Sequence, residues 1–330
     1  MLSSINSFYN SLFKDIREPY IPLLRILLVL ISMKEAFTSI SKFRAYFQSA
    51  GFFHRDDFLS DFLASFLANN LDLLYYGCWL FGIMSVIGLF SRISLALYFL
   101  IYFSSLYFDV NMGIYNHEAG LTAQILLVLI FSPGIRNISL DSILRKKVSL
   151  KSVFTITPYS NWSVRMILIL IAIGYFTAGI SKVRYGGMDW LDGETLSYYL
   201  SGKASHRNEV AQKFILSDSP DWKGEFSIDA YTYGNFQTKE NLLNFARSVS
   251  ENKPIMVFLS IFTVLFEILA VVILFSKPLK NVVFIMAIGF HFSIRIFMGL
   301  GFLDYQIICL SLIDWKYLYQ HSMLLVRRLI

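Results

Sequence analysis

Long apolar stretches separated by short polar segments run through almost the whole chain. A helix needs about 20 mostly apolar residues to cross a bilayer, so stretches near this length are predicted to span it. Such stretches occur at residues 22–40, 71–90, 92–108, 118–132, 164–182, 255–276, 282–300 and 301–320. Two of them are short, and Lys34 and Glu35 interrupt the first, so seven or nine spans are the alternatives. The pattern predicts an all-α, polytopic integral membrane helical bundle with about eight transmembrane helices.

The polar segments between the spans predict how they are oriented. The first apolar run begins near Ile21 without a small-residue cleavage site directly after it, so we expect a retained helix rather than a cleaved signal. Thirteen Lys and Arg residues lie in the two tails and in the short connections on their side, against three on the other side. Because positive charge favours the cytoplasmic side, both termini are expected to be cytoplasmic.

The longest connection, Val183–Pro254, then lies outside the cytoplasm. It is polar, but it carries Trp190 and Trp222 and several tyrosines, so we expect it to fold against the membrane as an extracytoplasmic cap over about residues 183–254. The sequence contains no internal repeat and no low-complexity tract. A single transmembrane domain over residues 1–330 is the simplest organisation.

Composition and charge narrow the class of protein further. Only 16% of the residues are charged, whereas an ordinary globular domain has about 25%. This deficit excludes a soluble multi-domain enzyme, a disordered chain and a collagen-like fibre. The net charge is +6, but no basic run exceeds the three residues Arg145–Lys147. The excess is therefore interpreted as a topology signal, and membrane lipids rather than nucleic acid are the expected partners.

The cysteines give no sign of a redox or metal framework. Cys78 and Cys309 each lie inside an apolar run. We expect both to be packing residues, because the sequence has neither a disulfide framework nor a zinc motif. No metal is expected.

Ionisable side chains inside the apolar runs are the candidates for chemistry, since each costs at least about 2.5–3.5 kcal/mol at membrane depth. Lys182 closes the fifth predicted span and His117 opens the fourth. Glu267 lies midway along the sixth span, and His291 and Arg295 lie four residues apart in the seventh, on one helix face. These side chains are expected to line one cavity that opens outward, with Glu267 paired to Arg295 or His291.

Each of these residues also has a structural interpretation. Lys182 fits a snorkelling residue at the membrane interface, and His117 fits an interfacial polar residue. Glu267 and its partner fit a purely structural intramembrane ion pair. In the functional alternative, Lys182 is a general base, because removal of water favours the neutral amine that accepts a proton. A neighbouring histidine would orient a substrate oxygen or relay a proton.

Several short segments, taken in order, carry a family resemblance. They are Pro22 to Arg25, Asn116-His117, Tyr175-Phe176 with Ala178-Gly179 and Lys182, Trp190 with Gly193 and Leu196, Glu267, and His291 with Gly299 and Phe302. Together they resemble the horizontally transferred transmembrane (HTTM) family, whose best-known member is the vitamin K-dependent gamma-carboxylase. The resemblance covers most of the chain, roughly residues 20–315, and rests on the order and spacing of the segments.

The resemblance implies an active site of the gamma-carboxylase-like type, with lyase and quinol-epoxidase chemistry. Lys182 matches the lysine base that deprotonates vitamin K hydroquinone, and His117 matches a position that assists the hydroquinone and oxygen steps. Lys182 and His117 are therefore the expected catalytic residues, and a reduced quinone of the vitamin K or menaquinone type is the expected cofactor. The residues expected to bind the substrate or cofactor are Trp190, Glu267, His291 and Arg295.

The resemblance leaves the substrate open. The carboxylase binds a propeptide through a large extracytoplasmic region after its spans, whereas here only Val183–Pro254 is available to recognise a peptide. The length is closer to that of small bacterial members, including those that help to mature secreted peptide toxins alongside partner proteins. An enzyme of a bacterial cell membrane is thus one expectation, and a non-catalytic component for maturation or export of a secreted peptide is the alternative. A transporter is not favoured, because no two-fold repeat of broken helices is found.

Overall fold

The computed structural model of the chain describes residues 13–47, 58–111, 117–146, 154–201, 240–298 and 301–329. These ranges are mostly helical, which confirms the predicted all-α class. One short antiparallel pair joins β1 (Asp15–Ile16) to β2 (Tyr159–Ser160), with Asp15 opposite Ser160. The part of the predicted cap that contains Trp222 lies outside the described residues.

The helices follow the order of the predicted spans along the chain. The first half of the chain contains α2 (Tyr20–Phe47), α3 (Phe58–Asn69), α4 (Leu71–Ile87), α5 (Ser91–Asn111), α6 (His117–Phe131), the 3-10 turn η1 (Pro133–Arg136) and α7 (Leu140–Lys146). The second half contains α8 (Trp162–Ser181), the π-helical turn η3 (Lys182–Gly186), α9 (Gly187–Leu191), α10 (Glu194–Leu200), α14 (Glu240–Ser250), α15 (Lys253–Leu269), the 3-10 turn η4 (Ala270–Leu274), α16 (Lys277–Met298), α17 (Leu303–Leu312) and α18 (Trp315–Leu329).

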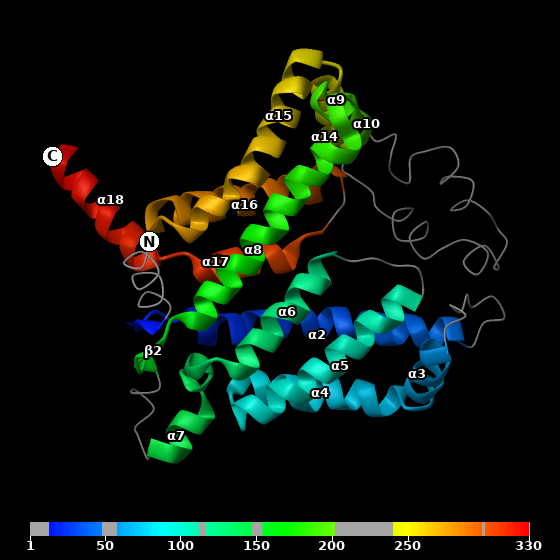
Figure 1. Ribbon diagram of the computed structural model, residues 1–330, viewed down its shortest axis with the longest axis vertical. Helices are drawn as coiled ribbons and strands as arrows, with labels where there is room; N and C mark the ends of the chain where they lie inside the picture. The colour runs from blue at the N-terminus through cyan, green and yellow to red at the C-terminus, as the bar shows by residue number, and fades with distance from the viewer. Residues whose placement is uncertain are drawn as a thin grey trace, which may run out of the picture.

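The helices form two packed groups. In Figure 1, α2 lies beside α4, α5 and α6, and it also contacts α17. The second group is built on α8, which packs against α15 and η4, and α16 packs against α17. Contacts of α6 with α8 and of α17 with α2 join the groups. The short helices α9, α10 and α14 lie together at the far end of α15, where the predicted cap begins and ends.

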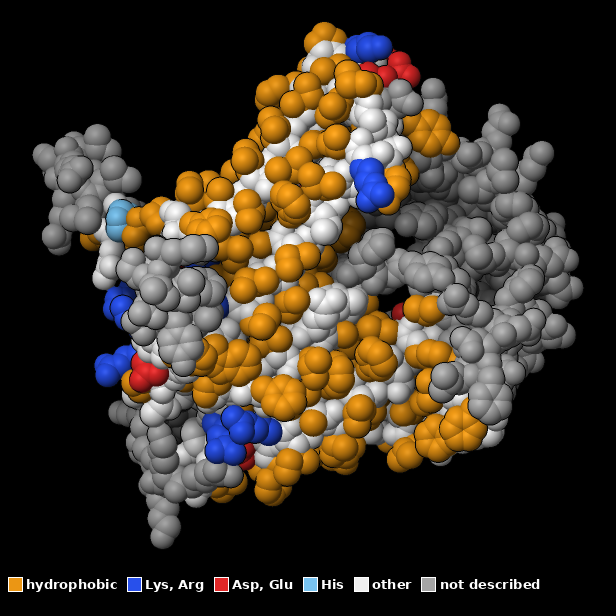
Figure 2. All heavy atoms as spheres, in the orientation of Figure 1, with side chains coloured by type: hydrophobic (Ala, Val, Ile, Leu, Met, Phe, Trp, Pro, Cys, Tyr) orange, Lys and Arg blue, Asp and Glu red, His pale blue; other side chains and the backbone are white. Residues whose placement is uncertain are grey.

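The lengths and surfaces of these helices are those of a membrane protein. Four described helical segments are long and apolar enough to cross a bilayer, namely Ser91–Val110, Trp162–Gly186, Lys253–Leu274 and Lys277–Phe297. Three shorter apolar helices accompany them, Leu71–Ile87, Ala119–Phe131 and Leu303–Leu312. Figure 2 shows apolar side chains covering the face formed by α4, α5, α8 and α15, with charged side chains gathered mainly at its edges. A total of eight spans and the location of the termini stay predictions.

The last predicted span differs from the structure. Residues 301–320 were expected to form one helix, but α17 ends at Leu312 and α18 begins at Trp315. Ile313 has an extended backbone, with ψ 134°, and the Asp314 carboxylate accepts a hydrogen bond from the Tyr317 backbone N–H at 3.0 Å. An aspartate in this position caps the start of a new helix, which is why the apolar run is divided. At 10 residues, α17 alone is shorter than a bilayer-spanning helix.

On one side of the bundle, buried polar side chains form hydrogen bonds with backbone groups at helix ends and turns. The fully buried Arg25 of α2 donates hydrogen bonds to the carbonyl oxygens of Ile135 (2.7 Å) and Ile138 (2.5 Å). Asp141 accepts hydrogen bonds from the backbone N–H and the hydroxyl of Ser91, both at 2.8 Å. These side chains therefore satisfy backbone groups that helix ends and turns leave without partners.

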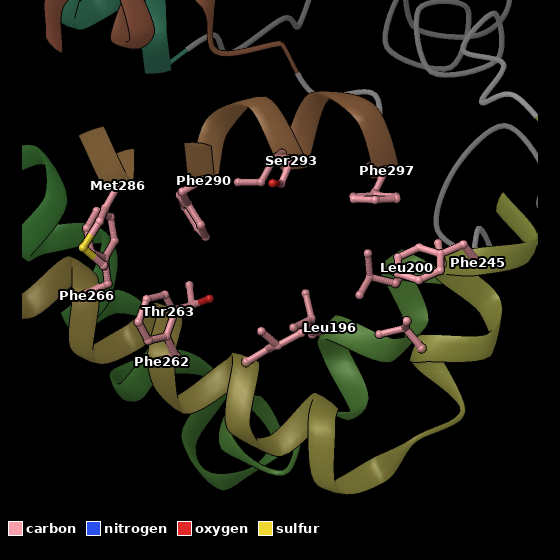
Figure 3. A pocket seen from close by; sticks show the side chains of 14 residues that line it. Leu196, Leu200, Phe245, Phe262, Thr263, Phe266, Met286, Phe290, Ser293 and Phe297 are labelled. Atoms are coloured by element: carbon pink, nitrogen blue, oxygen red, sulfur yellow. The ribbon is translucent and has the colours of Figure 1, made fainter. Parts of the chain in front are cut away.

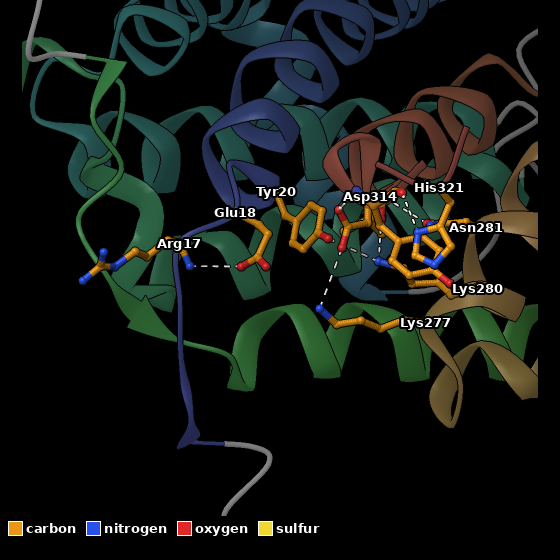
Figure 4. Close-up of polar contacts among 10 residues, drawn as sticks. Arg17, Glu18, Tyr20, Lys277, Lys280, Asn281, Asp314 and His321 are labelled. Carbon is orange, nitrogen blue, oxygen red and sulfur yellow. Dashed lines mark hydrogen bonds and ion pairs between the residues drawn. The ribbon is translucent and has the colours of Figure 1, made fainter. Parts of the chain in front are cut away.

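The same side is closed by residues of α16 and of the α17–α18 junction (Figure 4). The buried Lys280 ammonium donates to the Leu312 carbonyl at 2.7 Å and lies 4.7 Å from the centroid of the Tyr20 ring. The Asn281 side-chain oxygen accepts a hydrogen bond from the Asp314 backbone N–H at 2.9 Å. We call this side the pinned end and define it by Arg25, Asp141, Lys280, Asn281 and Asp314.

Candidate functional site

Far from the pinned end, Lys182 and Glu267 form a close ion pair between α8 and α15. The Lys182 Nζ atom lies 2.8 Å from Oε1 and 2.7 Å from Oε2 of Glu267. The Glu267 side chain is 7% exposed and the Lys182 side chain 22%. The prediction that Glu267 pairs with Arg295 or His291 is therefore wrong. The two residues are 85 positions apart in the sequence, so helix periodicity alone gave no sign of their contact.

A glycine allows the two helices to approach each other at this pair. Gly179 lies one helical turn before Lys182 and is packed against α15. A Cβ atom on Gly179 would lie 2.8 Å from a side-chain carbon of Ile268 and 3.1 Å from Cβ of Glu267. Since real Cβ atoms rarely come so close to other atoms, a larger residue would push α8 away from Glu267. Gly179 therefore positions the Lys182 ammonium.

Lys182 follows directly after α8, which agrees to within a few residues with the predicted end of the fifth span. Lys182 has helical φ and ψ values, and the chain continues through the π-helical turn η3 and then α9. A π-helical turn widens the helix locally and is often found at functional sites. Trp190 of α9 folds back, so that the Lys182 Nζ atom lies 5.7 Å from the centroid of its ring. Cation–π contact and the ion pair thus fix the lysine from two sides.

Gly193 connects this segment to the next helix. Its φ of 82° lies in the left-handed region that glycine adopts without strain. It is also buried against α15, where a Cβ atom would lie 2.7 Å from backbone atoms of Met256 and Val257. Gly193 therefore holds the start of α10 against α15, which explains its place in the family segment.

His291 lies in a second polar contact close by. Its Nε2 atom lies 2.7 Å from the hydroxyl of Tyr175, which is on α8 two helical turns before Lys182. Aromatic rings surround it, with Phe302 and Tyr305 centroids at 4.9 and 5.2 Å. The Nδ1 atom of His291 is buried and has no hydrogen-bond partner among the described residues. This nitrogen is therefore a buried polar atom that the described residues leave without a hydrogen bond.

The structure does not bring the remaining predicted residues into contact with the Lys182–Glu267 pair among the described side chains. Arg295 is exposed on α16 and is not joined to Glu267. The backbone of His117 begins α6, but its side chain lies outside the described residues, so its role stays a prediction. Cys78 and Cys309 are buried and free, as packing residues are expected to be. Within the described ranges, no three His, Cys, Asp or Glu side chains are grouped so that they could hold a metal ion.

The contacts of two further carboxyl groups, those of Glu35 on α2 and Asp304 on α17, were not predicted from the sequence. Glu35 accepts a hydrogen bond from the Tyr102 hydroxyl at 3.0 Å. Asp304 at the start of α17 accepts one from the Thr122 hydroxyl on α6. The Glu35 carboxyl group, which interrupts the first apolar run, thus has a hydrogen-bond partner on α5, and α2 continues unbroken through it. Tyrosine and threonine within apolar runs were the available signal for these contacts.

The fold and this pair define a class, namely helical membrane proteins with a lysine–carboxylate pair held between spanning helices. The HTTM domain profile matches residues 13–222, which is more than half of the chain. The chain therefore belongs to the HTTM family, and the predicted resemblance is confirmed. The match includes Lys182 and Trp190, whereas Glu267 and His291 lie beyond it. No curated protein and no solved structure matches the chain.

Proposed function

We propose that this protein is an integral-membrane enzyme of the gamma-carboxylase-like type, in which Lys182 is the general base. Its substrate would be a lipid-soluble quinol, a secreted peptide, or both, reached on the side of the membrane away from the cytoplasm. The observation that supports this best is the contact of the Lys182 ammonium with both carboxylate oxygens of Glu267, in a largely buried setting. Family membership supports the chemistry.

The pair offers a way to make a neutral amine inside the membrane. Transfer of one proton from Lys182 to Glu267 leaves an amine and a carboxylic acid, and neither form requires a buried charge. The amine then takes the hydroxyl proton of the quinol, which leaves a quinolate anion beside the Lys182 ammonium. Trp190 limits the freedom of the lysine chain. His291 is proposed, from its place beside Tyr175 on α8, to orient a substrate oxygen. His117 is proposed as the assisting residue from the resemblance alone.

A quinol fits the surroundings of this pair. Reduced quinones with hydrocarbon tails dissolve in the bilayer, and Lys182 and Glu267 lie on helical segments long and apolar enough to cross it. The reduced quinone is therefore the proposed cofactor. A secreted peptide and a partner maturation protein are proposed for the cap side, where α9, α10 and α14 lie.

The second candidate function is a non-catalytic membrane component for maturation or export of a secreted peptide. The same ion pair favours it in one respect, because a lysine bound to both oxygens of a carboxylate is also a stable structural contact between helices. A structural ion pair requires only that residue 182 carries a positive charge. A general base requires in addition that the group on residue 182 can lose its proton.

One substitution separates the two functions. Lys182→Arg keeps a cation opposite Glu267, but a guanidinium does not lose its proton near neutral pH. The purified protein would be supplied with menaquinol and oxygen, and quinol consumption and epoxide formation would be measured. We expect Lys182→Arg to fold and to lose activity. Lys253→Arg is the matched control, because Lys253 forms an exposed pair with Glu194 at 3.3 Å. Full activity in Lys182→Arg would contradict the catalytic proposal.

A further inference from the structure

The described residues form two apolar surfaces of different kinds. One is a cavity of about 520 Å³ inside the molecule, whose walls come from α10, α14, α15 and α16 and include Phe262, Phe266 and Phe297 (Figure 3). The other lies on the outside, on α18, which starts at the pinned end and points away from the bundle (Figure 1). Because its apolar side chains are exposed, this second surface is available to a partner.

Trp315, Tyr319 and Met323 form an apolar stripe along α18. They lie four residues apart, so the helix places them on one face. Their exposed fractions are 52%, 67% and 41%. Lys316 and Gln320 directly follow the first two, about 100° around the helix, and are exposed as well. The helix is therefore amphipathic, with an exposed polar face beside an exposed apolar one.

The first turn of α18 lies at the level where α16 begins its apolar segment. That segment, Lys277–Phe297, is long and apolar enough to cross a bilayer. The Nζ atom of Lys277, its first residue, lies 3.7 Å from a carboxylate oxygen of Asp314, which directly precedes α18. Leu318 in the first turn is partly buried and packs against the core. The start of α18 is thus fixed at the boundary of the membrane-spanning part.

Exposed cations gather at the same end of the bundle. On the segments that form the pinned end and on the start of α18, the exposed cations with described side chains are Lys14, Arg17, Arg92, Arg136, Lys277 and Lys316. Asp15 is the one exposed carboxylate among the described side chains there. The sequence adds Arg327 and Arg328 to α18. This end is the one predicted to be cytoplasmic, where the leaflet carries anionic lipids that complement these charges.

We propose that α18 lies along the membrane surface at the pinned end. Trp315, Tyr319 and Met323 enter the boundary between headgroups and acyl chains, and the cations contact anionic phospholipid headgroups. The inference goes beyond the proposed function and does not depend on Lys182. A helix directed into water would leave the apolar stripe exposed to it, at a cost in free energy. A second copy of the chain fits less well, because pairing of two identical stripes would bring the cations of both copies together.

A matched pair of positions on α18 tests the proposal. Met323→Cys and Gln320→Cys place a nitroxide spin label on the apolar stripe and on the neighbouring polar face of the same helix. Cys78 and Cys309 are buried, and the unmodified chain treated with the label gives their background. Each protein is reconstituted into phosphatidylcholine vesicles with increasing fractions of phosphatidylglycerol. Electron paramagnetic resonance then compares collisions of the label with oxygen, which dissolves in the acyl layer, and with a water-soluble nickel chelate.

We expect the label at residue 323 to become accessible to oxygen and protected from nickel as phosphatidylglycerol increases, whereas the label at residue 320 stays accessible to nickel. Equal nickel accessibility at both positions in phosphatidylglycerol vesicles would overturn the proposal. Equal protection of residue 323 in phosphatidylcholine alone would also overturn it, because anionic headgroups would then have no part. Protection that decreases when the protein is diluted in the vesicles would assign the stripe to a second copy instead.

A second pair of variants tests the charge. In the labelled Met323→Cys chain, Lys316→Gln removes an exposed cation from α18, and Lys253→Gln removes one from the start of α15, beside the cap helices. Measurements are made at the phosphatidylglycerol fraction that inserts half of the label. Lys316→Gln should lower the ratio of inserted to free label about fivefold, the usual contribution of one cation at an anionic surface. Lys253→Gln should leave the ratio unchanged. An unchanged ratio in Lys316→Gln, or an equal decrease in both variants, would contradict the proposal.

Discussion

The two sides of the bundle use buried polar side chains in different ways. At the pinned end, Arg25, Asp141 and Lys280 reach mainly backbone carbonyl and N–H groups, and so complete the hydrogen bonds of helix ends and turns. Around the candidate site, Lys182 contacts Glu267 and Tyr175 contacts His291, and an apolar cavity lies beside them. A backbone amide does not titrate near neutral pH, whereas a carboxyl, ammonium or imidazole group can take up or release a proton. This contrast separates residues that hold the fold from residues available for chemistry.

The largest expected effect is at the pinned end. Arg25→Met should prevent accumulation of folded protein, because it removes the donor from the buried carbonyl group of Ile135 and from the partly buried carbonyl group of Ile138, at about 1–3 kcal/mol each. The amount of monodisperse protein after membrane extraction measures this. Arg92→Met, on the exposed side of α5, is the control and should behave like the unmodified chain. Normal yield from Arg25→Met would remove the basis for calling this end structural.

Next in size is the intramembrane pair. Lys182→Met or Glu267→Gln alone should destabilise the protein by about 3 kcal/mol, since each leaves a largely buried partner without its counterpart. The double variant should be more stable than the sum of the two losses predicts. Thermal unfolding in detergent gives the three values. Additive losses would mean that the two side chains do not interact.

The exposed pair of Lys253 and Glu194 provides the matched comparison for that cycle. Its side chains are 68% and 73% exposed, so the same double-variant cycle should give a coupling of about 1 kcal/mol or less. A coupling as large as that of Lys182 and Glu267 would show that burial is not what distinguishes the two pairs.

A smaller effect is expected from a change at Gly179, where α8 and α15 pack closely against each other. Gly179→Ala should cost about 1–3 kcal/mol and reduce activity more than stability, because the added Cβ atom would displace Lys182 from Glu267. Gly289→Ala on α16 meets nothing within 4 Å and should be neutral or slightly stabilising. Thermal unfolding and turnover of both variants provide the test. If Gly179→Ala keeps full activity, close approach of α8 and α15 is not required.

Much of this architecture could be predicted from apolar run lengths, because hydrophobic burial in the bilayer determines where helices form. The division of the last run could not, since it depends on one side chain, Asp314, which caps α18. Lys182 and Glu267 were identified individually from the cost of charge at membrane depth. Their pairing was missed because it depends on how α8 packs on α15. No periodicity within one helix encodes that contact.

The fold shows structural roles for three residues in the segments that carry the family resemblance. Gly179 gives the close approach, Trp190 contacts the lysine, and Gly193 provides a positive φ at the start of α10. The cavity could not be predicted from the sequence, because its phenylalanine and leucine residues do not differ in type from those on the lipid-facing side of a membrane helix. Only the gap left between the cap helices and α15 and α16 distinguishes them.

The central claim is that an amine on residue 182 takes a proton from the substrate. The most direct measurement is turnover of menaquinol by Lys182→Ala with added methylamine or ethylamine. The alanine variant should be slower by about 100- to 10,000-fold, and added amine should restore part of the rate, increasingly as pH rises and the free amine becomes more abundant. Lys182→Ala turning over menaquinol at the unmodified rate without any added amine would contradict the claim.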